Sequence, residues 1–132
     1  MNINKLILPL LSGLLLGLSY PPFSFGFLAW IAFIPLLHCI AKEEKISHKA
    51  LFGFVACFSS NLIILNWMGL NSGTSPMIAI ISYLALSLYL TIFWIAFIIS
   101  THFIPKKMQL FLTPLSWIFF VEFLRNMGPL AG

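Results

Sequence analysis

The stretch 18-LSYPPFSFGFLAW-30 places two adjacent prolines, Pro21 and Pro22, among aromatic residues in the middle of an apolar run. That run carries no Asp, Glu, Lys or Arg from Leu6 to Ala41. As one helix it would be about 54 Å long, whereas the hydrocarbon core of a bilayer is about 30 Å thick. Proline lacks an amide donor and pushes the preceding residue toward extended geometry. The stretch therefore predicts a helix stop and restart, the bend of a membrane hairpin.

The composition extends this interpretation to the whole chain. Of 132 residues, 61% are hydrophobic and 8% are charged, whereas soluble domains carry about 25% charged residues. We expect an all-α integral membrane protein, a bundle of about five transmembrane helices whose first two form a short hairpin at Pro21/Pro22. Residues 1–132 are predicted to be one transmembrane domain with no soluble domain. The predicted spans are approximately 6–20, 25–41, 50–67, 77–103 and 110–124.

The cations predict the orientation of these spans. The formal net charge is +4, and six of the seven cations lie at the N-terminus or between apolar segments: Lys5, Lys42, Lys45, Lys49, Lys106 and Lys107. With five spans they share one face, which is cytoplasmic by the positive-inside rule. We expect a multi-pass protein of the bacterial inner membrane with a cytoplasmic N-terminus and a periplasmic residue 132. Because these lysine clusters are explained by membrane orientation, they give no support to nucleic-acid binding.

The first twenty residues leave one alternative open. A short positive start followed by an apolar stretch also fits a secretory signal peptide. Against this, the apolar character resumes directly after Pro22, and no convincing small-x-small cleavage site is present. We favour a retained span.

Few residues suit catalysis or metal binding. The chain has no aspartate, no HExxH and no phosphate-binding glycine loop. Cys39 and Cys57 lie in apolar segments without CxxC spacing, so we expect ordinary buried thiols. Three histidines are scattered along the chain, with no spacing typical of a metal site. We predict no catalytic residue, no metal and no cofactor in this sequence.

Glu122 and Arg125 are the main candidates for a binding site. Their i, i+3 spacing puts both on one face of a helix. An ionisable residue at the end of a membrane span is a functional candidate because it is costly to bury unpaired. The alternative is a mutually satisfied pair that ends the helix at the outer interface.

Two further patterns concern helix packing. Gly13 and Gly17 form a GxxxG, which permits close approach of a second helix. Internal packing and dimerisation both fit it, so the oligomeric state stays open. Asn61 and Asn66 make the outer half of the third segment polar. We favour helix-to-helix hydrogen bonds there over contact with a polar substrate.

Three segments together resemble the N-terminal membrane part of bacterial apolipoprotein N-acyltransferase. They are 11-LSGLLLGLSYPPFSFGFLAWIAFIPLL-37, 53-GFVACFSSNLIILNWM-68 and 115-LSWIFFVEFLRNMGPLAG-132. The first is the most specific, with a glycine-rich helix, a Pro-Pro-Phe turn and a second proline, Pro35. The last resembles the family's Trp, Glu, Leu-Arg region through Trp117, Glu122 and Arg125. These three residues are our candidates for substrate binding.

The resemblance implies transfer of an acyl chain from a phospholipid to the N-terminal diacylglyceryl-cysteine of an apolipoprotein, through a thioester on an enzyme cysteine. Family members carry that cysteine, with a Glu and a Lys, in a nitrilase-like domain that this sequence does not contain. The chain would be an N-terminal fragment of about a quarter to a third of a member. Its implied partners are membrane phospholipid and diacylglyceryl apolipoprotein, and alone we expect it to be inactive.

Two other classes remain open from the sequence. One is a small integral membrane protein that binds or transports a lipid or solute. The other is a structural membrane subunit that assembles through the GxxxG face.

Overall fold

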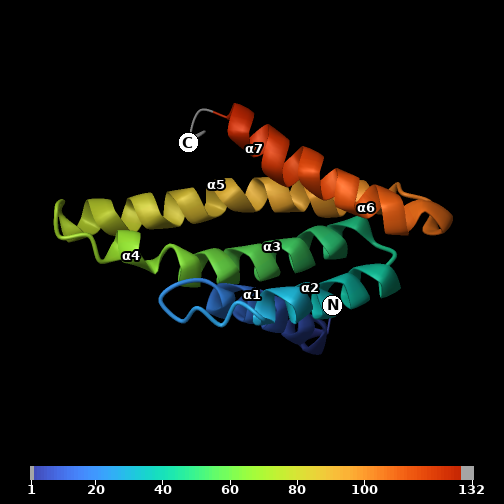
Figure 1. The fold of residues 1–132 in the computed structure, drawn as a ribbon, viewed down its shortest axis with the longest axis horizontal. Coiled ribbons are helices and arrows are strands. Elements are labelled where there is room, and N and C mark those ends of the chain that lie inside the picture. Colours follow the sequence, from blue (N-terminus) through green and yellow to red (C-terminus); the bar gives the residue numbers. More distant parts are fainter. Residues whose placement is uncertain (1, 129–132) are drawn as a thin grey trace.

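The computed structural model describes residues 2–128, and all regular secondary structure in this range is helical (Figure 1). Three continuous helical segments are long and apolar enough to cross a membrane: Ile46–Ile64, Pro76–His102 and Lys106–Met127. The prediction of an all-α membrane protein is confirmed. The elements are η1 (Ile3–Leu6), α1 (Ile7–Ser19), α2 (Leu28–Lys42), α3 (Ile46–Ile64), α4 (Asn66–Gly69), α5 (Pro76–His102), η2 (Lys106–Met108), α6 (Gln109–Trp117), η3 (Ile118–Phe123) and α7 (Leu124–Met127).

The predicted hairpin is present. Helix α1 ends at Ser19, α2 begins at Leu28, and the two prolines lie in the turn between them. The amide of Phe25 donates to the carbonyl of Leu18 at 3.2 Å and closes that turn. Deeper in the hairpin, the buried hydroxyl of Ser12 donates to the carbonyl of Ala32. The 15 residues of α2 are about 22 Å long as a helix, so a full membrane crossing by each arm stays a prediction.

The lysines gather at one end of the bundle. In Figure 1 the N-terminus, the α2–α3 connection and the α5–α6 connection lie at the right-hand end, and the α1–α2 turn and α4–α5 connection lie at the left. An ion pair of 3.2 Å between Lys5 and Glu43 joins two of the right-hand segments. All six lysines that we expect on one membrane face lie in these segments or in the helix ends that border them. The structure thus agrees with the alternation of loops on which the orientation depends.

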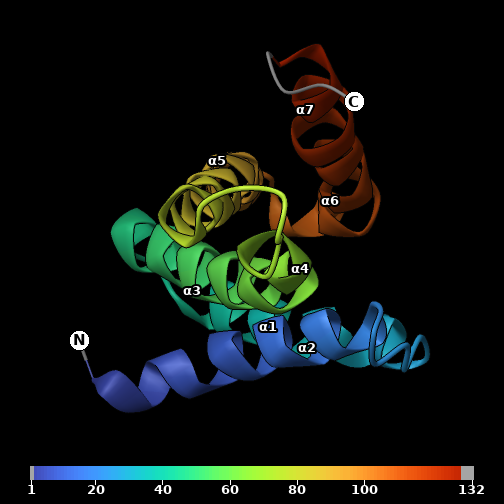
Figure 2. The same ribbon diagram turned by 90° about the vertical axis from the view of Figure 1, so that its left-hand side faces the viewer.

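Helix α3 occupies the centre, between α1 and α5 (Figure 2). The α1 face that meets α3 is the GxxxG face. A Cβ atom added at Gly13 would collide with the carbonyl of Ala56 and the hydroxyl of Ser59, and one added at Gly17 would lie 2.7 Å from Ile63. The GxxxG motif therefore serves internal packing of α1 on α3 in this structure, rather than dimerisation.

A polar contact joins α3 to α5. The side-chain amide of Asn61 donates to the backbone carbonyl of Ser87 at 3.4 Å and to the sulfur of Cys57 at 3.3 Å. Asn61 is buried, and a buried amide needs partners of this kind. The contact agrees with the favoured interpretation, a helix-to-helix hydrogen bond.

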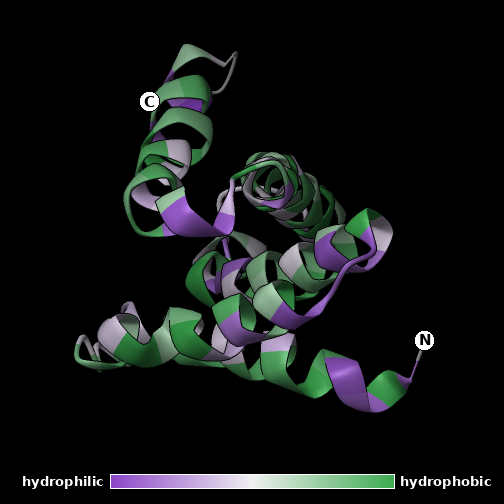
Figure 3. Cartoon of the chain, turned by 90° about the vertical axis from the view of Figure 1, so that its right-hand side faces the viewer, coloured by the Kyte–Doolittle hydropathy of each residue, from purple (hydrophilic) through white to green (hydrophobic). Residues whose placement is uncertain are grey.

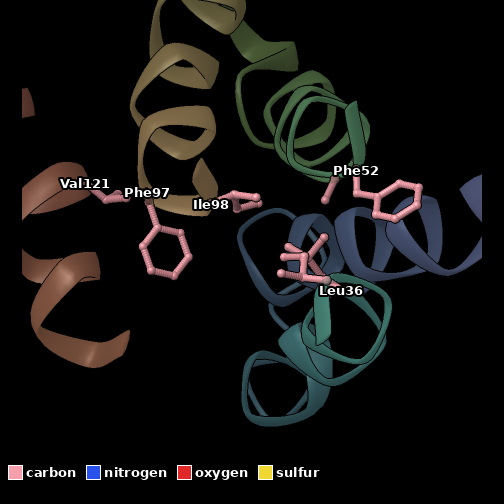
Figure 4. Packing of buried hydrophobic residues seen from close by; sticks show 7 residues of the cluster. Leu36, Phe52, Phe97, Ile98 and Val121 are labelled. Atoms are coloured by element: carbon pink, nitrogen blue, oxygen red, sulfur yellow. The ribbon is translucent and has the colours of Figure 1, made fainter. Parts of the chain in front are cut away.

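A small apolar core holds the helices together. Leu36 of α2, Phe52 of α3, and Phe97 and Ile98 of α5 are buried, with Val121 completing the row on the last helical segment (Figure 4). Many large apolar side chains outside it are exposed, Trp30 by 88% for example. Exposed apolar surface on this scale is typical of a protein that faces lipid rather than water.

Candidate functional site

The three predicted site residues lie on the C-terminal helical segment, which is irregular where they occur. Pro114 lies inside α6 and deprives the carbonyl of Leu110 of its helical amide partner. After Trp117 the chain continues as a π-helix, Ile118–Phe123, before α7. π-Helical turns are rare and frequently occur at functional sites. This segment carries Glu122, so the irregular backbone coincides with the predicted site.

Glu122 and Arg125 form the expected pair. An Nη2 of Arg125 donates to an Oε2 of Glu122 at 3.1 Å. The two side chains are 46% and 41% exposed, among apolar residues such as Phe119 and Phe123, which are also exposed. A guanidinium has five N–H donors, and this bond uses one of them. The pair is therefore accessible and has spare donors for a phosphate or carbonyl oxygen.

Trp117 has different surroundings from the pair. Its ring packs edge-on against Trp94, Phe97 and Phe33, with centroids 5.0, 5.2 and 5.2 Å away. Phe33 also stacks on Trp94 at 5.5 Å. We call these four residues the aromatic cluster; it joins α2, α5 and α6. Trp117 thus packs the C-terminal helical segment against α2 and α5.

Two features of this region were missed by sequence reasoning. The partners of Trp117 lie far from it in the chain, so no local pattern reveals the cluster. Tyr89 has a buried hydroxyl with no hydrogen-bond partner among residues 2–128. A Cβ atom added at Gly128 would collide with that hydroxyl, so Tyr89 contacts the end of the C-terminal helix. A tyrosine in an apolar helix gave no signal of this contact.

A second charged group lies at the lysine-rich end. The carboxylate of Glu43 accepts bonds from the backbone amides of Glu44 and Lys45 at 3.2 and 3.3 Å, and from the ammonium of Lys5 at 3.2 Å. His48 lies 3.3 Å from it. The Lys45 amide, followed by Lys5 and His48, lowers the pKa of Glu43 to about 2. These contacts attach the N-terminal segment to the α2–α3 connection.

The two thiols lie on other helices than the Glu122–Arg125 pair. Cys57 is buried on α3, and Cys39 lines a cavity of about 300 Å³ with Lys5 and Glu43 at the lysine-rich end. Both thiols are free. Within the described range, no group of three or more His, Cys, Asp or Glu residues is placed to hold a metal ion. In the described part of the chain, the Glu122–Arg125 pair and the two thiols thus belong to different helices.

Comparison with known proteins covers nearly the whole chain. Residues 12–132 match the family model described as the apolipoprotein N-acyltransferase N-terminal domain. Among curated proteins, the chain is 28% identical over 137 residues to the apolipoprotein N-acyltransferase of Thermotoga maritima. That alignment covers 96% of this chain and 27% of the relative, so the chain spans about a quarter of its length. No solved structure matches the chain.

The matched residues include the hairpin turn, the central helix α3 and the whole C-terminal segment with Trp117, Glu122 and Arg125. The resemblance inferred from the Pro-Pro-Phe turn and the Trp, Glu, Leu-Arg region is thereby confirmed. The chain belongs to the apolipoprotein N-acyltransferase N-terminal domain family.

Proposed function

We propose that this chain forms the membrane-embedded N-terminal part of an enzyme that transfers an acyl chain from a phospholipid to the N-terminal diacylglyceryl-cysteine of a lipoprotein. The observation that carries the proposal is the family match over residues 12–132. The lipid-facing surface of the helices supports it, because both substrates of such a reaction are anchored in the membrane. The work of this part is to hold and orient those substrates.

Glu122 and Arg125 suit that work chemically. The free α-amino group of a diacylglyceryl-cysteine is a cation for which a carboxylate such as Glu122 is the natural partner. A guanidinium binds phosphate and carbonyl oxygens through paired N–H donors, so Arg125 suits the ester and phosphate groups of either lipid. Trp117, through the aromatic cluster, keeps the helix that bears both groups in place. We propose these three residues as substrate-binding and positioning residues.

Acyl transfer through a thioester needs a reactive thiolate beside the bound substrates. Cys57 is buried between helices, and Cys39 lies at the lysine-rich end of the bundle. Neither thiol lies on the helical segment that bears Glu122 and Arg125. We therefore propose that the 132-residue chain binds lipid substrate without acylating it.

One experiment tests binding and inactivity together. The purified chain in phospholipid vesicles is irradiated with a benzophenone-labelled diacylglyceryl-cysteinyl peptide, and mass spectrometry locates cross-links and any N-acylated product. We expect cross-links on residues of the C-terminal segment and no acylated peptide. The double variant Glu122→Gln/Arg125→Gln should lose roughly nine-tenths of the cross-links, as the loss of one or two charge-assisted hydrogen bonds implies.

The matched control is the double variant Glu44→Gln/Lys107→Gln, which removes the same charges from exposed positions at the lysine-rich end. It should cross-link like the parent chain. Equal losses in the two double variants would refute a binding role for Glu122 and Arg125. Acylated peptide in the presence of the chain alone would refute the proposed inactivity.

We also propose that the lysine-rich end is cytoplasmic and that the chain lies in the bacterial inner membrane. In a background with both native cysteines replaced by alanine, Lys45→Cys should be protected from an impermeant maleimide added to intact spheroplasts. Ser72→Cys, at the opposite end of the bundle, should react with the maleimide during the same incubation. Both positions are exposed in the structure, so both should react after permeabilisation. Protection of Ser72→Cys with labelling of Lys45→Cys would reverse the orientation.

A further inference from the structure

Lys49 differs from the other lysines of its end. It lies in the first turn of α3 and is only 9% exposed. Among residues 2–128 its ammonium makes no ion pair, and no side-chain hydrogen bond is formed by it. Most of the Lys49 side chain is packed among its neighbours, whereas its ammonium keeps contact with solvent. The ammonium of Lys49 can therefore pair with an anionic ligand.

Lys49 lines a cavity of about 850 Å³ between α2, α3, α5 and α6. Two further lysines line it, Lys42 at the end of α2 and Lys106 at the start of η2. Gln109 and Thr113 of α6 add an amide and a hydroxyl to the wall. Figure 3 looks onto this end of the bundle, where hydrophilic segments meet helices that are otherwise hydrophobic. Three cations and several hydrogen-bonding groups thus converge on one space.

The acidic residues of the wall leave this space positive. Glu43 and Glu44 both line the cavity, but Glu43 already accepts from two backbone amides and from Lys5, with His48 beside it. Glu44 is the one carboxylate of the wall that no ion pair within the described range engages. Three lysines against one uncommitted carboxylate favour a ligand with net negative charge.

The rest of the wall is apolar. Leu37 and Ile40 of α2 and Leu110 and Pro114 of α6 line the same cavity. Leu110 is 80% exposed, on a surface that in a membrane meets acyl chains. The cavity volume falls within the range of about 300–1,000 Å³ typical of ligand sites. A ligand that satisfies both parts of the wall has an anionic head and an acyl tail.

From these contacts we infer that the cavity binds the head of an anionic glycerophospholipid, with the phosphate between Lys42, Lys49 and Lys106. The acyl chains leave between Leu37 of α2 and Leu110 of α6. Basic pockets between helices at a membrane face are known sites for anionic lipid heads. This lipid is bound rather than consumed, so the inference goes beyond acyl transfer. That it comes from the cytoplasmic leaflet rests on the proposed orientation.

The test measures lipid retention by the intact chain. Native mass spectrometry compares phosphatidylglycerol with phosphatidylcholine on protein released from mixed micelles that contain equal amounts of the two. We expect roughly tenfold preference for phosphatidylglycerol, the ratio that one charge-assisted hydrogen bond supplies. Lys49→Met should abolish the preference. Lys107→Met should keep it, because Lys107 is a neighbouring exposed lysine outside the cavity wall.

Thermal unfolding gives a second readout and guards against misfolded variants. Phosphatidylglycerol should raise the melting temperature of the parent chain and of Lys107→Met, but not that of Lys49→Met. In phosphatidylcholine alone Lys49→Met should melt no lower than the parent, because within the described residues Lys49 makes no ion pair that the substitution would remove. If it does not fold, Lys106→Met, at an exposed position on the wall, replaces it and should lose the same preference.

Three results would overturn the inference. One is equal retention of the two lipids by the parent chain. Another is an equal loss of preference in Lys49→Met and Lys107→Met, which would indicate a general surface charge effect. The third is a rise in melting temperature with inorganic phosphate, in phosphatidylcholine micelles, that equals the rise with phosphatidylglycerol. That result would assign the cavity to a soluble anion. Micelles carry no leaflets and no acyl transfer is measured, so failure of the proposed function or orientation does not change these outcomes.

Discussion

Gly13→Ala is expected to destabilise the chain by about 1–3 kcal/mol, the usual cost of overpacking a close contact. Alanine is the better helix former by about 1 kcal/mol, so propensity alone predicts the opposite sign. The structure decides between the two effects. The new methyl group would collide with the backbone carbonyl of Ala56 and with the hydroxyl of Ser59. A backbone atom cannot rotate away, so α1 must separate from α3.

Thermal unfolding in detergent, monitored by circular dichroism, measures this loss of stability. Gly26→Ala is the matched control, because a Cβ atom at Gly26 meets nothing within 4 Å. Sedimentation of both variants adds a readout for the alternative role of the GxxxG motif. If Gly13→Ala unfolds like Gly26→Ala but changes the oligomeric state, the motif is a dimer contact and internal packing is wrong.

The hairpin and the grouping of the lysines could be predicted because each depends on local chemistry. Two adjacent prolines, Pro21 and Pro22, remove two amide donors and favour a helix stop, and the length of the apolar run excludes a single span. The grouping of the lysines at one end follows from the number of helices, because each additional helix reverses the end of the bundle at which the next connection lies. These arguments need no knowledge of which helix packs on which.

The partners of individual residues could not be predicted, because they depend on which helices pack together and not on local chemistry. The GxxxG motif shows that a helix approaches closely, but its spacing does not name that helix. Trp117 meets Phe33 and Trp94 only because α2, α5 and α6 converge, and no local pattern encodes that convergence.

Lys49 shows how a small boundary difference matters. The predicted third span begins at residue 50, which leaves Lys49 in a solvated loop, whereas α3 begins at Ile46. The earlier start carries Lys49 into the first helical turn and against its neighbours, where it is buried. Sequence reasoning places such boundaries only to within a few residues, so a binding role for this lysine becomes visible only in the structure.

Trp117→Ala is expected to cost about 3 kcal/mol, the lower part of the range for truncating a packed aromatic residue. Three ring contacts at centroid distances of 5.0–5.2 Å are lost. Lipid tails can partly fill the space, because membrane helices associate through packing rather than through exclusion of water. The loss of stability should be concentrated in the C-terminal segment. Hydrogen exchange by mass spectrometry should therefore show faster exchange in Gln109–Met127, with little change in α1.

Trp30→Ala is the control, because the Trp30 side chain is 88% exposed and its removal should change neither unfolding nor exchange. Trp117→Phe separates packing from substrate contact, since a phenyl ring keeps most of the aromatic cluster. If Trp117 acts by positioning its helix, Trp117→Phe should retain both stability and the cross-links to the diacylglyceryl peptide. Loss of cross-links at unchanged stability would instead make Trp117 a direct substrate contact. Unchanged exchange in Trp117→Ala would contradict the role of the aromatic cluster in holding Glu122 and Arg125 in place.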